Sequence, residues 1–160
     1  MPLSLAVIPA DLMDRRNPDC RDASNPCRND DNVFLLNPSP NRIYPWGDKA
    51  DMERMNFADT DVNQTSALGC FPGGASPYGA EEMAGNVWEW TRSVYRLYPY
   101  QPGDGREESA SRDPRVLRGG AFFNFSRSAR CSVRLYYLPD NRYLDFGFRV
   151  VVSPFTFSER

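Results

Sequence analysis

The most informative part of the chain reads Met83-Ala84-Gly85-Asn86-Val87-Trp88-Glu89-Trp90-Thr91. Trp88 and Trp90 alternate with Glu89, as in a strand whose successive side chains point to opposite faces. One face can then bury the two indole rings while the carboxylate points elsewhere. Gly85 precedes this pattern and suits a backbone conformation or a close approach that a β-carbon would block. The stretch therefore predicts a core strand over Val87–Thr91.

Short glycine-containing blocks stand on both sides of this stretch. They read Tyr44-Pro45-Trp46-Gly47-Asp48, Phe71-Pro72-Gly73-Gly74-Ala75-Ser76-Pro77-Tyr78-Gly79, Val116-Leu117-Arg118-Gly119-Gly120 and Gly147-Phe148-Arg149-Val150-Val151. Together the blocks strongly resemble the formylglycine-generating-enzyme, or sulfatase-modifying-factor, family. The resemblance implies an α+β, C-type-lectin-like fold of low regular secondary structure, with short antiparallel strands and long loops.

The length of 160 residues fits one domain. We expect the lectin-like domain to span residues 43–160, with a diverged N-terminal segment, 1–42, packing on it. Besides Val87–Thr91, the aromatic and β-branched runs predict strands at Arg115–Leu117 and Phe146–Val152. The polar connection between Val94 and Ser111 is typical of a surface loop. Arg118 and Arg149 are expected to make fixed hydrogen bonds to carboxylates or carbonyls.

Composition limits which partners the protein could bind and which catalytic mechanisms it could use. The formal net charge is −2 and the sequence pI is about 5.2, which gives no general attraction to nucleic acid or to anionic membranes. Histidine is absent, so Ser-His and Cys-His catalysis within this chain is excluded. We expect no signal peptide and no membrane-spanning segment, because Met1–Met13 has no basic start and is interrupted by prolines.

The four cysteines, Cys20, Cys27, Cys70 and Cys131, match no zinc pattern, and their disulfide pairing stays open. The family resemblance implies a catalytic cysteine pair five positions apart that binds copper, which here would be Ser126 and Cys131. A single cysteine cannot supply two thiolates, and related non-heme-iron enzymes require histidine. We therefore expect a protein that is not an enzyme and has no cofactor. The alternative is a family enzyme or accessory protein that has lost its cysteine pair.

We assign no metal site. Asn86 and Glu89 lie where the resemblance places a calcium site of relatives, and Asn56, Asp59 and Asp61 resemble a second such site. Oxygen ligands suit calcium, but the sequence lacks the ligand count of a defined calcium loop. Turn capping is the alternative role of these side chains.

The segment between Gly120 and Gly147 has a second resemblance. Its pattern of Arg130, Arg134 and Pro139-Asp140-Asn141-Arg142 before Gly-Phe-Arg resembles the variable region of proteins diversified by diversity-generating retroelements. In those proteins, asparagine codons of a template are rewritten at adenines, which cannot yield Lys, Glu, Gln, Met or Trp from AAC. None of these five residue types occurs between Gly119 and Ser158, where the usage of the whole chain predicts about four or five.

The resemblance implies a variable, ligand-binding region at 121–146. Its positions here are Phe123, Asn124, Phe125, Ser128, Val133, Leu135, Tyr136, Tyr137, Leu138, Tyr143, Leu144 and Asp145. We expect Phe123, Phe125, Tyr136, Tyr137 and Tyr143 to be exposed as one contiguous patch, with Asn124 and Asp145 adding hydrogen bonds. Phe146 and Phe148 are expected in the core.

We therefore predict a non-enzymatic binding protein whose partner is a macromolecule, most simply a protein. Nucleic acid and direct membrane insertion are not expected. The compartment stays open, with display on a cell or virus surface as one option.

Overall fold

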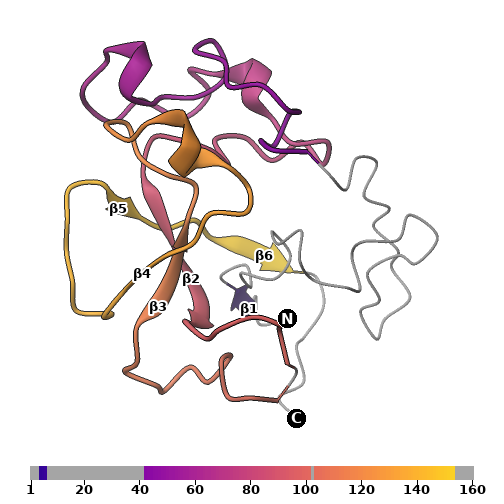
Figure 1. The fold of residues 1–160 in the computed structure, drawn as a ribbon, viewed down its shortest axis with the longest axis vertical. Helices are drawn as coiled ribbons and strands as arrows, with labels where there is room; N and C mark the ends of the chain where they lie inside the picture. Colours follow the sequence, from indigo (N-terminus) through magenta and orange to yellow (C-terminus); the bar gives the residue numbers. More distant parts are fainter. Residues whose placement is uncertain (1–3, 7–41, 102, 154–160) are drawn as a thin grey trace.

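The computed structural model describes residues 4–6, 42–101 and 103–153, so most of the N-terminal segment expected at 1–42, with Cys20 and Cys27, lies outside the described residues. The centre is a four-stranded sheet of order β4-β3-β2-β5 (Figure 1). Its strands are β2 (Trp88–Val94), β3 (Arg115–Arg118), β4 (Leu135–Tyr137) and β5 (Phe146–Gly147). A second pair joins β1 (Ser4–Ala6) to β6 (Val151–Ser153).

The helical elements are short. The structure gives 3-10 turns at η3 (Ala58–Thr60), η4 (Pro72–Gly74) and η5 (Ser126–Ala129). None of the helices in the described ranges has the length and apolar character needed to cross a membrane.

The register of the sheet follows the expected alternation. In the antiparallel β2–β3 pair, Glu89 lies opposite Arg118 and Trp90 opposite Leu117. Strand β5 runs parallel to β2, with Phe146 opposite Trp88. The strands expected near Val87–Thr91 and Arg115–Leu117 are confirmed; the first begins one residue later and ends three residues later, and the second ends one residue later.

The strand expected at Phe146–Val152 is instead two strands, because the chain changes partners. Strand β5 pairs with β2, whereas β6 pairs with β1. Between them Arg149 leaves the ladder and donates hydrogen bonds to the Glu89 carboxylate, at 2.6 and 2.5 Å, and to the carbonyls of Glu81 and Glu82. Phe148, expected in the core, is therefore turned outward and is 73% exposed.

Strand β4 is a feature that the sequence pattern did not predict. Its three residues, Leu135, Tyr136 and Tyr137, are all large, so the residue types show no alternation. Pairing with β3 imposes the alternation, because Leu135 and Tyr137 become half-buried while Tyr136 is exposed.

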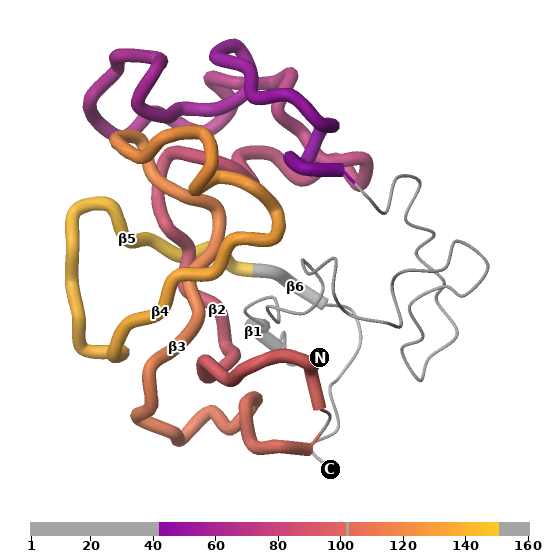
Figure 2. Tube along the Cα trace, viewed as in Figure 1, coloured from indigo at the N-terminus to yellow at the C-terminus, as the bar shows by residue number. Residues whose placement is uncertain are grey.

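The core has two parts. One, at the loop end, contains Tyr44, Met55, Phe57, Ala84 and Ala129. The other lies on the sheet and contains Trp88, Leu117 and Ala121. Figure 2 shows the loop segment 42–80 lying beside the segment around η5, where the Ala58 N–H donates to the Asn124 carbonyl and the Cys131 N–H to the Ile43 carbonyl.

Gly85 and Asn86 join these two parts. Both have left-handed backbone, with φ values of 80° and 65°, which glycine and asparagine adopt at least cost. The Gly85 N–H donates to the Gly119 carbonyl at 2.8 Å, and the Asn86 N–H donates to the Asn56 carbonyl at 2.8 Å. A β-carbon on Gly85 would lie 2.3 Å from the same Asn56 oxygen, so the motif requires glycine at this position.

Candidate binding surface

The structure divides the twelve expected binding residues by exposure. The exposed ones are Phe123, Phe125, Tyr136, Leu138, Tyr143 and Leu144. The half-buried ones are Asn124, Ser128, Val133, Leu135 and Tyr137. Asp145 is buried.

One face of the four-stranded sheet carries a group of touching aromatic rings, named here the sheet-face cluster: Trp90, Tyr137, Tyr143 and Phe146. Phe146 lies at its centre, with ring centroids 5.5 Å from Trp90, 5.2 Å from Tyr137 and 4.9 Å from Tyr143. The strand register explains this grouping, because Trp90, Leu117 and Leu135 are successive partners across the sheet, and Tyr137 follows Leu135 by two residues. Candidate binding residues and other residues of the sheet thus share one aromatic surface.

The loop from β4 to β5 completes this surface. Asn141 closes it as a turn, since its N–H donates to the Leu138 carbonyl and its side-chain oxygen accepts from the Leu138 N–H. At the far end the Trp88 N–H donates to the Asp145 carbonyl at 2.8 Å. Between these two anchors Leu144 is 81% exposed, so the loop is held by its backbone and presents its side chains.

Tyr136 lies on the opposite face of β4 from Tyr137, because consecutive strand residues alternate. Its ring stacks on Tyr95 at 4.1 Å between centroids. The expectation of one contiguous patch is therefore corrected: neighbouring candidate residues contribute to two different faces of the sheet.

A third group lies at η5. Phe123 and Phe125 are exposed, as expected, and Arg127 lies 4.9 Å above the Phe125 ring. Asn124 between them is a structural residue, because its side-chain oxygen accepts from the Ala121 N–H and its carbonyl from the Ala58 N–H. Its side chain shapes the loop and does not extend the surface.

Asp145 does not reach the surface as expected, since only 7% of it is exposed. Burial raises the pKa of its carboxyl group. Glu82, which sequence reasoning missed, is also buried, and burial raises its pKa although the backbone N–H groups of Gly69 and Phe71 oppose the shift. Nothing in the sequence signals this, since Glu81-Glu82 reads as an exposed turn.

Three of the five side chains considered for calcium have other roles here. The Asn86 side-chain oxygen accepts from the Ser66 N–H at 2.9 Å, and the Glu89 carboxylate pairs with Arg149. The Asn56 amide donates to the Gln64 carbonyl. Within the described ranges, no group of three or more His, Cys, Asp or Glu side chains could hold a metal ion.

Arg118 has the structural role expected of it. The guanidinium is buried under the candidate region and donates from Nη1 to the carbonyls of Cys131 and Val133, at 3.1 and 2.9 Å. Cys131 is half-buried and Cys70 is exposed. Arg118 thus fixes the backbone that leads into β4.

Comparison with known proteins identifies relatives of this chain. It is 38% identical over 117 residues to a hercynine oxygenase of Mycolicibacterium thermoresistibile, covering 68% of this chain and 26% of that protein. It is 32% identical over 122 residues to the inactive C-alpha-formylglycine-generating enzyme 2 of Bos taurus, covering 68% and 36%. The chain therefore spans about a quarter to a third of the length of these relatives.

Solved structures show the fold. PvdO from Pseudomonas aeruginosa is similar with a TM-score of 0.61 at 22% identity, over 92% of this chain and 52% of that chain. Treponema denticola variable protein 1 is similar with a TM-score of 0.50 at 23% identity, over 61% and 35%. The α+β, C-type-lectin-like fold is thus confirmed, as is the resemblance of the fold to a variable protein.

The expectation that the protein is not an enzyme is contradicted by these relatives. Three proteins with 34 to 38% identity are hercynine oxygenases by name. The exclusion rested on residues absent from this chain, and such absences carry little weight in a chain that spans about a quarter of an enzyme.

The model of the sulfatase-modifying factor enzyme 1-like domain matches residues 39–154. With the folded blocks around Gly85, Arg118 and Gly147 in place, the chain belongs to the formylglycine-generating-enzyme, or sulfatase-modifying-factor, family.

Proposed function

We propose that residues 121–146 form a variable surface that binds a protein ligand and is diversified by a retroelement. The lectin-like framework holds this surface, and the domain is displayed on a cell or virus surface. Nucleic acid is not the ligand, since the chain carries a net charge of −2.

The observation that carries the proposal is that the residues that hold the backbone of this segment differ from the residues that it exposes. Framework residues make the structural contacts: Arg118 holds the backbone before β4, and Asn141 closes the turn after it. Leu138, Tyr143 and Leu144 are exposed and lie before and after Asn141 in the chain. Replacing an exposed side chain therefore removes little of the packing that stabilises the fold.

The chemistry of the exposed positions favours a protein ligand. Exposed tyrosine and phenylalanine side chains are enriched at protein interfaces. Tyrosine also offers a large contact area with few rotatable bonds, as in antibody paratopes. The exposed aromatic residues here, Phe123, Phe125, Tyr136 and Tyr143, fit that description.

A pair of libraries tests the proposal. One randomises Leu138, Tyr143 and Leu144, and the control randomises the buried Val116, Leu117 and Phe122. We expect most clones of the first library to fold and selection on immobilised lysozyme to yield specific binders, whereas most control clones unfold. Equal loss of folding in both libraries, or no binder from a well-folded first library, contradicts the proposal.

The genome offers an independent test of the retroelement. We expect a reverse transcriptase gene near the coding sequence, with a near-copy of the segment for residues 121–146 that differs only at adenines. Homologous genes that vary evenly along their length count against diversification.

A second candidate is a role in an oxygenase, favoured by the 38% identity to a hercynine oxygenase. In this role the described domain would form part of a substrate site. Titration of the protein with hercynine, followed by amide chemical shifts, tests this candidate: saturable shifts at Trp90 and Tyr137 support it, and their absence at millimolar hercynine contradicts it.

A further inference from the structure

Strand β4 forms one edge of the central sheet. In the order β4-β3-β2-β5 it has a neighbouring strand, β3, on one side only. The outward backbone groups of an edge strand can form hydrogen bonds with an added strand. The register of β4 on β3 decides which of its groups point outward.

A hydrogen bond of β3 fixes this orientation. Val116 lies opposite Tyr136, and its carbonyl accepts from the Thr91 hydroxyl of β2 at 2.9 Å. The Val116 backbone therefore faces β2. In an antiparallel pair, residues that exchange both backbone hydrogen bonds alternate with residues that exchange none. Tyr136 thus belongs to a pair without these bonds, and its N–H and carbonyl point away from β3.

The end of the ladder agrees with this orientation. The reverse orientation would need a hydrogen bond from the Leu138 N–H to the Pro114 carbonyl. Instead the Leu138 N–H donates to the Asn141 side-chain oxygen at 3.1 Å, and the Pro114 carbonyl accepts from the Tyr95 N–H at 2.7 Å. Among the described residues, no loop or side chain forms a hydrogen bond with the Tyr136 backbone.

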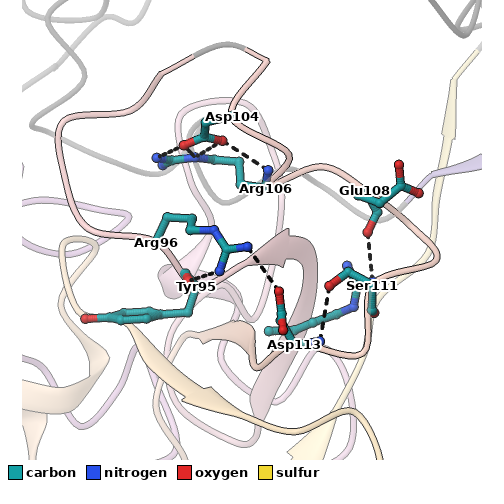
Figure 3. A network of polar contacts seen from close by, with 8 residues as sticks. Tyr95, Arg96, Asp104, Arg106, Glu108, Ser111 and Asp113 are labelled. Carbon is teal, nitrogen blue, oxygen red and sulfur yellow. Dashed lines mark hydrogen bonds and ion pairs between the residues drawn. The ribbon is translucent and has the colours of Figure 1, made fainter.

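The edge is held in place on both sides. Arg118 bonds the backbone before β4, and Asn141 closes the turn after it. Figure 3 shows the loop from β2 to β3, where an ion pair of Arg96 with Asp113 at 3.0 Å ties the end of β2 to the start of β3. An edge that is ordered before binding loses little entropy when a partner binds.

The edge also gives access to both faces of the sheet. Tyr136 stacks on Tyr95 on one face, and Tyr137 contacts Tyr143 on the other, with ring centroids 5.4 Å apart. Tyr136 and Tyr143 are each 50% exposed. Alternate side chains of an added strand point to opposite faces, so one such strand would contact candidate residues of both.

We propose that an extended segment of the protein ligand adds to the outer edge of β4 and pairs with the N–H and carbonyl of Tyr136. This inference rests on the proposed function and names the form of the ligand. The backbone N–H and carbonyl stay the same when most side chains at position 136 are exchanged. Pairing through the backbone is therefore compatible with diversification, while the side chains on both faces select the ligand sequence.

Hydrogen exchange of the free chain tests the orientation of β4. We expect the Tyr136 amide to exchange quickly, because it points to solvent, and the amides of Leu135 and Tyr137 to be protected by their bonds to β3. Equal protection of all three amides overturns the inference.

A peptide titration tests the binding. The probe is Ac-Lys-Thr-Val-Thr-Val-Thr-Lys-NH2, whose β-branched residues favour an extended backbone, and the control is the same peptide N-methylated at its five central residues. We expect the first peptide to shift the Tyr136 amide signal of the whole chain in a saturable manner. It should bind more tightly than the control by about fivefold or more, the scale of one or two hydrogen bonds.

Two variants separate the backbone of Tyr136 from its side chain. Tyr136→Pro removes the N–H at a position where proline is tolerated, because the N–H of this edge residue faces solvent. It should lose the preference for the unmethylated peptide, whereas Tyr136→Ala should keep it. Amide spectra establish that each variant is folded, and if Tyr136→Pro does not fold, the exchange rates and the methylated peptide decide the question.

Equal affinity of the wild-type chain for both peptides, or a preference that persists in folded Tyr136→Pro, overturns the inference. A dimer in sedimentation that Tyr136→Pro dissociates would also overturn it, since a second copy would then occupy the edge. Each of these results leaves the proposed function standing. Failure of the proposed function would appear separately, in the library experiment, which leaves β4 unchanged.

Discussion

Replacement of Gly85 by alanine should destabilise the whole domain. The residue has a φ of 80°, and a left-handed conformation costs an alanine about 1–2 kcal/mol. The added β-carbon would also lie 2.3 Å from the Asn56 carbonyl oxygen. Forcing that backbone apart costs about 1–3 kcal/mol, as overpacking does elsewhere. We therefore expect Gly85→Ala to lower the free energy of unfolding by about 2–5 kcal/mol.

The matched control is Gly79→Ala. Gly79 has a similar φ of 76°, but no atom lies within 4 Å of its added β-carbon. Only the backbone strain of about 1–2 kcal/mol applies there. The difference between the two variants isolates the steric clash with Asn56.

Urea denaturation followed by tryptophan fluorescence measures both variants. With a slope of about 2 kcal/mol per molar urea, Gly85→Ala should lower the midpoint by about 1–2.5 M, and Gly79→Ala by less than about 1 M. If the two variants shift the midpoint equally, the close approach of Gly85 to Asn56 does not hold the loop to the sheet, and the reasoning is refuted.

Three further changes test the framework. Leu117→Ala removes a fully buried core residue and should lower the free energy of unfolding by about 2–5 kcal/mol in the same urea assay, whereas an unchanged midpoint would show that the sheet core is not cooperative. Because burial raises the pKa of Glu82, the stability linked to its protonated form is fully present below the unfolded pKa and is lost as pH rises through the folded pKa. Glu82→Gln should therefore gain stability relative to the wild type as pH rises above the unfolded pKa, as urea denaturation at a series of pH values would measure. The Arg106 side-chain hydrogen bond lowers the pKa of Asp104, so the contribution of this pair to stability is present at neutral pH and is lost as pH falls through the folded pKa. Because Asp104 is exposed, Asp104→Asn should lower the free energy of unfolding by about 1 kcal/mol or less at pH 7, and by less in acid, as urea denaturation at the two pH values would measure.

Much of the framework could be predicted from residues whose roles are local. The alternation of Trp88, Glu89 and Trp90 predicts β2 because side chains on a strand alternate between faces. Gly85 predicts a backbone conformation that a β-carbon would disfavour, and the structure confirms it with a left-handed φ of 80°. Arg118 and Arg149 were expected to bond carbonyls or carboxylates, and both do.

Elements that depend on a distant partner could not be predicted in this way. The segment from Phe146 to Val152 reads as one strand, but its two ends pair with strands far apart in the chain, β2 and β1. Strand β4 is visible only through its pairing with β3. Pairing over such sequence separations leaves little local trace, because register is set by both partners.

The sequence by itself determined the family, the framework blocks and the segment 121–146 with its restricted set of residue types. Motifs and residue types depend only on which residue stands at each position, so they can be recognised without a structure. Only the tertiary structure decided where the side chains of that segment point. The register of β4 on β3 places Tyr136 and Tyr137 on opposite faces, burial removes Asp145 from the surface, and the folded loop brings Tyr98 against Arg134. Exposure depends on contacts between residues far apart in the chain, and such contacts exist only once the sheet has formed.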